Sequence, residues 1–115
     1  MITQDISLFE QVDLIIENAD NANYKLLIAS LEKGIDIARL QYESEEAIMS
    51  FFNYSGLAEH IADHVRLRQV FTETQAIILS GTLPQGNVIQ LVAELRQTLL
   101  AHQTHFDDLY TNTRL

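Results

Sequence analysis

The sequence predicts an all-α protein, an antiparallel up-down four-helix bundle made by a single domain over residues 1–115. Apolar residues recur every three or four positions along four long segments, and there is almost no apolar-polar alternation of the kind that strands show. The only proline, Pro84, and three of the four glycines lie at or near places where this period breaks. Four amphipathic helices with short connections pack most economically as such a bundle.

The first helix is predicted over about residues 4–18. Four positions recur there at helical spacing and are expected to face the core: Ile6, Phe9, Val12 or Asp13, and Ile16. Residues 20–23 read Asp-Asn-Ala-Asn, which supplies both a turn and an N-cap for the helix that follows. The chain therefore reverses direction at this point.

The remaining three helices follow from the same period. The second is predicted over residues 24–52 as one long helix, because the apolar phase survives Gly34 although glycine weakens a helix by about 1 kcal/mol relative to alanine. The third lies between turns at residues 53–56 and 80–84, and the fourth covers about residues 87–112. This arrangement makes consecutive helices antiparallel neighbours.

Composition and charge limit the expected partners. Hydrophobic residues make up 47% of the chain and charged residues 20%, as is typical of a soluble globular protein. The net charge of −9 repels phosphates and anionic lipids, so neither a nucleic acid nor a membrane is expected as a partner. No signal segment or long apolar run occurs, which favours a cytoplasmic location. The chain has no cysteine, so thiolate metal sites are excluded.

Polar residues that could bind a metal lie in phase with the apolar stripes. Glu45 and the pair His60 and His64 lie on opposite sides of one turn, and His102 lies beyond the next turn. Antiparallel helices would bring these four residues to one level, and Asp107 could join them from the helix of His102. Burying three imidazoles and two carboxylates is costly unless a cation compensates. Nitrogen and carboxylate ligands without sulfur suit iron, manganese or zinc.

Other polar residues nearby are expected to play different parts. His105 lies about 60° around the helix from His102, so it is predicted to be a partly exposed bystander. Asp63 and Glu59 could accept hydrogen bonds from the imidazoles and fix their tautomers. Three further acidic residues are interpreted as ordinary solvated charges: Glu43, Glu46 and Asp108. Glu59 has the same interpretation if it accepts no hydrogen bond from an imidazole.

The order and spacing of the candidate ligands resemble the haemerythrin-like family. The resemblance covers about residues 38–110 and rests on Glu45-Glu46-x-x-Met49, Tyr54, His60-x-x-Asp63-His64 and His102-x-x-x-x-Asp107. It implies a non-haem di-iron site in which three histidines hold one iron, and Glu45 and Asp107 bridge to a second. Proteins of that family bind, store, carry or sense oxygen at the second iron, and some handle nitric oxide or peroxide.

The sequence departs from that family at the second iron, which uses two further histidines. One would stand four residues before the bridging glutamate, where this chain has Gln41. The other would fall near residues 1–7, where Gln4 and Asp5 are poor substitutes. Gln41 and Tyr42 are the remaining candidate ligands, although neutral amides and phenols bind metals weakly. These departures indicate a mononuclear or asymmetric di-iron site and speak against reversible oxygen carriage.

Three hypotheses for the function follow. The favoured one is a haemerythrin-like iron protein that binds or senses oxygen or nitric oxide, or carries out modest peroxide chemistry, as a binding protein rather than an enzyme. The second is a zinc-occupied or structural bundle that couples metal occupancy to stability or to a protein partner. The third is a metal-free interaction module in which the same residues form a hydrogen-bonded polar core.

Overall fold

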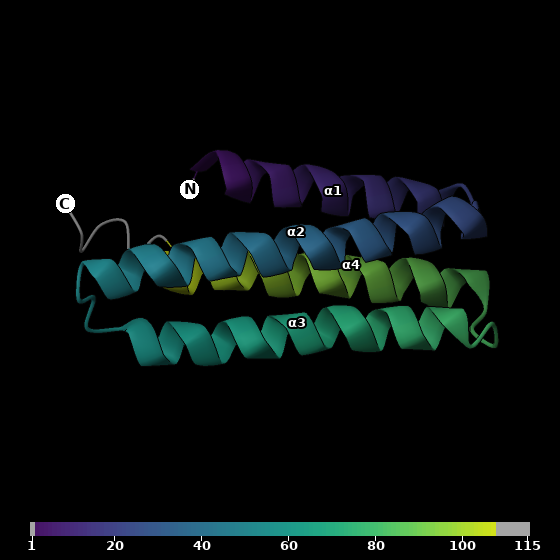
Figure 1. Ribbon diagram of the computed structural model, residues 1–115. Helices are drawn as coiled ribbons and strands as arrows, with labels where there is room; N and C mark the ends of the chain where they lie inside the picture. The colour runs from purple at the N-terminus through teal and green to yellow at the C-terminus, as the bar shows by residue number, and fades with distance from the viewer. Residues whose placement is uncertain (1, 108–115) are drawn as a thin grey trace.

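The protein is an all-α bundle of four helices, as predicted. The computed structural model describes the backbone of residues 2–107 and the side chains of residues 8–106. In this range the chain forms, without any strand, α1 (Ile2–Asp20), α2 (Tyr24–Phe51), α3 (Leu57–Leu79), α4 (Gln85–His102) and a short π-helix, η1 (Gln103–Asp107). The helices run up and down, with α1 and α3 each packed against α2 and α4 (Figure 1). None of the described helices is both long and apolar enough to cross a membrane.

Helix α2 runs almost the full length of the bundle. Its 28 residues span about 42 Å at 1.5 Å per residue, and the long axis of the molecule measures 45 Å. Gly34 does not interrupt it, so the prediction of one long helix is confirmed. A Cβ atom at Gly34 would lie 3.2 Å from Phe71 and 3.3 Å from Ile15. The missing side chain thus lets residues of α1 and α3 approach α2 closely.

The fourth helix agrees with the prediction at its start and differs after His102. The α-helix starts at Gln85, within two residues of the predicted start, and ends at His102. The π-helix η1 continues the chain to Asp107, and residues after 107 lie outside the described part. Widening the turn after His102 changes the angular positions of the residues that follow, which helical spacing alone does not signal.

Short turns connect the helices. Asn53 and Gly81 have positive φ angles of 54° and 72°, in the left-handed region that asparagine and glycine tolerate best. Ala22 adopts the same region with a φ of 54° in the first turn. Asn23 then caps α2, since its side chain accepts a hydrogen bond from the backbone N–H of Leu26 at 3.3 Å. These turns make successive helices antiparallel.

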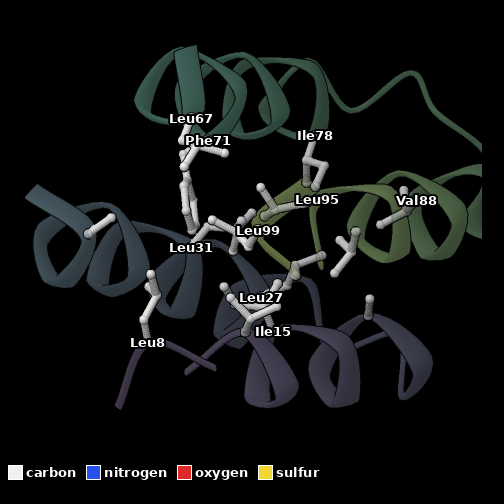
Figure 2. Close-up of a cluster of buried hydrophobic side chains, with 14 of the residues drawn as sticks. Leu8, Ile15, Leu27, Leu31, Leu67, Phe71, Ile78, Val88, Leu95 and Leu99 are labelled. Carbon is white, nitrogen blue, oxygen red and sulfur yellow. The ribbon is translucent and has the colours of Figure 1, made fainter. Parts of the chain in front are cut away.

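An apolar core lies along the bundle axis, with contributions from all four helices (Figure 2). On the predicted α1 stripe, Val12 is fully buried, whereas Phe9 and Ile16 are only partly buried at the edge of the core. Phe52, the last residue of the predicted second helix, follows the end of α2 as its C-cap and is 55% exposed. The residues of α1 that do enter the core are Leu8, Val12, Ile15 and Ala19.

Candidate metal site

Four of the five predicted metal ligands meet in the core near one end of the bundle. Glu45 comes from α2, His60 and His64 from the first two turns of α3, and His102 from the last residue of α4. Each is at most 3% exposed, so water hardly reaches these polar side chains. One ligand atom from each residue lies within 4.8 Å of the others. In the described residues this is the only such cluster of three or more candidate ligands, and it is close enough to hold a metal ion.

The distances around Glu45 match those between ligands of one ion. Glu45 Oε1 lies 3.4 Å from His64 Nε2 and 3.7 Å from His60 Nε2. Two atoms that each lie about 2.1 Å from a tetrahedral metal are about 3.4 Å apart. Neither Glu45 Oε1 nor His64 Nε2 makes a hydrogen bond within the described part of the chain, although both are buried. Buried polar atoms normally have a partner, and a cation between these two atoms would supply one.

Two of the imidazoles form hydrogen bonds through Nδ1 with carboxylates on neighbouring helices. Glu46 on α2 contacts His64 Nδ1 at 2.7 Å, and Asp63 on α3 contacts His102 Nδ1 at 2.6 Å. Because a carboxylate can only accept, each Nδ1 is the donor, and in a neutral imidazole the lone pair is then on Nε2. This tautomer leaves the lone pair of His64 Nε2 facing the oxygen of Glu45. Metal-bound histidines use the same carboxylate support.

The buried Glu45 and the partly buried Asp63 both favour the ionised form. Burial alone would raise the pKa of Glu45, but an imidazole proton of His60 or His64 facing Oε1, together with a hydrogen bond from Gln41, holds it well below its usual range. Burial opposes ionisation of Asp63 as well. Hydrogen bonds from Arg66 and His102 outweigh that effect and lower its pKa. The cluster therefore keeps a negative charge in the core that a cation would balance.

The role of Glu46 differs from the prediction. It was interpreted as a solvated charge, but its side chain is only 28% exposed and pairs with His64. Glu46 stands four residues after the buried Tyr42, at the border of the apolar stripe, and this position is the signal that could have revealed its role. The other predictions on nearby polar residues are confirmed for Asp63, which supports His102, and for His105, which is exposed.

Two acidic residues predicted as solvated charges lie at the surface, and a third, Asp108, lies outside the described residues. Glu43 is exposed and pairs with Arg39 at 3.7 Å, as expected for a solvated charge. Glu59 is exposed in the first turn of α3 and stays a surface charge. Neither residue belongs to the cluster of four candidate ligands.

The weaker candidate ligands, Gln41 and Tyr42, are both buried beside the cluster. The amide nitrogen of Gln41 donates to Glu45 Oε2 at 3.1 Å, so this residue supports the carboxylate. The ring of Tyr42 stacks on the imidazole of His64, with centroids 4.0 Å apart and planes 9° apart. Both residues thus contact a candidate ligand, and whether either binds a metal itself stays a prediction.

The π-helix η1 covers the cluster from the C-terminal side. The ring of Phe106 stacks near His102 and lies beside His60, with centroid distances of 5.4 Å in both cases. Asp107 is the last residue of η1, but its side chain lies outside the described residues, as do those of Gln4 and Asp5. The prediction that Asp107 is a fifth ligand is therefore neither confirmed nor contradicted.

Comparison of the chain with models of known protein families, with curated proteins and with solved structures gives no match. The fold and the cluster nevertheless define a class of protein: a four-helix bundle whose core holds one glutamate and three histidines close enough to bind a metal ion. The chemistry of these donors fits a divalent transition metal, because imidazole and carboxylate together suit iron, manganese and zinc.

Proposed function

We propose that this chain is a haemerythrin-like non-haem iron protein that binds or senses a small ligand, oxygen or nitric oxide, or handles peroxide. His60, His64, His102 and Glu45 would hold the iron, and Asp107 would add a further carboxylate. The proposal describes a binding or sensing protein rather than an enzyme. Its support comes from the site geometry and from the resemblance of the ligand spacing to the haemerythrin-like family.

The observation that carries the proposal is the close approach of His64 Nε2 to Glu45 Oε1. The two atoms are 3.4 Å apart, both are buried, and Glu46 fixes the imidazole so that its lone pair faces the carboxylate. Two electron-rich atoms at this distance repel unless a proton or a cation lies between them. A metal ion satisfies both, and the rings of His60 and His102 add two further nitrogen donors.

The residues around the cluster prepare it for an ion. Glu46 and Asp63 orient their imidazoles and increase the basicity of the nitrogen atoms that face the centre. Tyr42 and Phe106 flank the rings with aromatic surface, which keeps water away from the donors. Iron bound there would supply a redox-active Lewis acid with positions open to a small ligand.

Metal loading with a spectroscopic readout tests the proposal. Chain loaded anaerobically with iron(II) is expected to retain iron through gel filtration and to develop an absorption band when nitric oxide is added, or when azide is added after air has oxidised the iron to iron(III). His60→Ala should abolish both results, whereas His105→Ala should change neither, because His105 is exposed and outside the cluster. Failure to retain iron, or equal behaviour of the two variants, would contradict the proposal.

A closed zinc site is the second candidate, and the ligand spacing favours it. The 3.4 Å separation between His64 and Glu45 fits tetrahedral coordination by four protein ligands, which is typical of structural zinc. In that case the ion would stabilise the bundle and bind no small ligand. Tight retention of zinc with no iron uptake would select this role, while loss of every metal would select the metal-free interaction module.

A further inference from the structure

We propose that Gln41 limits this centre to a single metal ion, because it occupies one of the two oxygens of Glu45. The inference rests on the proposed metal binding and concerns the number of ions that the site accepts. Gln41 would then determine how many ions the site binds without being a ligand of the bound ion.

The two carboxylate oxygens of Glu45 have different surroundings. Oε1 faces the imidazoles of His64 and His60 at 3.4 and 3.7 Å, whereas Oε2 accepts a hydrogen bond from the amide of Gln41 at 3.1 Å. Both side chains are buried, Glu45 at 0% and Gln41 at 4% exposure. Glu45 therefore presents one oxygen to the cluster of imidazoles and turns the other toward its own helix.

The chemistry of the pair fixes the orientation of the amide. An ionised carboxylate has no proton to donate, so only the NH₂ group of Gln41 can face it favourably. The two residues are four positions apart on α2, where side chains lie one above the other. The hydrogen bond is therefore local to α2.

A second ion could reach Glu45 only at Oε2, where the amide hydrogens now lie. Binding there would break a buried hydrogen bond to a charged group and leave the NH₂ group facing a cation. The loss of this hydrogen bond opposes a second ion, while the imidazole side of Glu45 stays available to the first.

Counting bound ions tests the inference. Wild-type chain is titrated with cobalt(II), and the ions per chain are counted by native mass spectrometry and by visible absorption. Gln41→Glu keeps the shape of the side chain but replaces the donor with a carboxylate. The charge-matched control is Gln69→Glu, which makes the same change at an exposed position of α3.

We expect one tightly bound ion in the wild type and in Gln69→Glu, and two in Gln41→Glu. Removing the hydrogen bond to the charged group should tighten the second ion by about 10- to 100-fold. If Gln41→Glu does not fold, Gln41→Ala, which removes the donor without adding charge, should raise the fraction with two ions at high cobalt.

The outcomes separate this inference from the proposed function. A wild type that binds two ions tightly overturns the inference but leaves the metal site intact. Folded Gln41 variants that still bind one ion overturn the role of Gln41. A wild type that binds no ion overturns the proposed function, and the inference with it.

Discussion

Removing Asp63 should weaken metal binding without removing any ligand. The carboxylate of Asp63 contacts His102 Nδ1 at 2.6 Å and is only 11% exposed, so this is a short, charge-assisted hydrogen bond largely shielded from water. It fixes the tautomer of His102 and makes Nε2 a stronger donor. In metal sites, loss of such a supporting group typically reduces metal affinity about 10- to 100-fold. The expected effect of Asp63→Ala is therefore about 1.4 to 2.8 kcal/mol of binding free energy.

Competition with a coloured chelator for cobalt(II) at pH 7 measures this effect. Glu73→Ala is the matched control, because it removes an exposed carboxylate from the same helix, away from the cluster. Arg66→Ala removes the other partner of Asp63 and should have a small effect, since the side chain of Arg66 is 53% exposed. A dissociation constant for Asp63→Ala within twofold of the wild type would refute the reasoning.

Three further predictions follow from the same structure. Metal should be released as the pH is lowered, because protons compete for the imidazole nitrogens, and stoichiometric metal after dialysis at about pH 4 would argue against the site. Glu45 and Asp63 have lowered pKa values, so their ionised carboxylates stabilise the folded state. This stabilisation is complete above the ordinary carboxyl pKa of about 4 and is lost as the pH falls through the lowered pKa values. The difference in unfolding free energy between wild type and Asp63→Ala should accordingly be present at pH 6 and shrink below about pH 4, and urea titrations showing the opposite trend would be inconsistent with it. Phe71→Ala should reduce the free energy of unfolding by about 3–5 kcal/mol, because this ring is fully buried against Gly34, and a loss below about 1 kcal/mol would disprove the packing argument.

The convergence of the histidines and Glu45 could be predicted because it depends on two simple quantities. Helical phase determines which side of a helix a residue faces, and distance from the turn determines its level in an antiparallel bundle. Glu45, His60, His64 and His102 satisfy both conditions, and the structure brings them together. The long helix across Gly34 was predictable for a similar reason, because the apolar phase continued on both sides.

The wrong predictions concern positions where the apolar period fits two alternative stripes or where the sequence carries no signal. In α1, apolar residues stand at both 8 and 9 and at both 15 and 16, so two adjacent stripes fit the period, and packing against α2 selects Leu8 and Ile15. Glu46 was missed because its partner, His64, is on another helix, and the orientation of one helix around its axis decides whether they meet. The change from α- to π-helix after His102 also left no mark in the spacing of apolar residues.

The stacking of Tyr42 on His64 gives the chain a built-in optical probe. The chain contains no tryptophan and four tyrosines, so its near-ultraviolet absorption and emission come mainly from tyrosine. Tyr42 is buried, and its ring lies parallel to the imidazole at a centroid distance of 4.0 Å. A positive charge arriving on that imidazole changes the electric field across the phenol ring. Tyrosine emission and near-ultraviolet circular dichroism can therefore follow events at the cluster in unlabelled protein, with Tyr42→Phe as the blank.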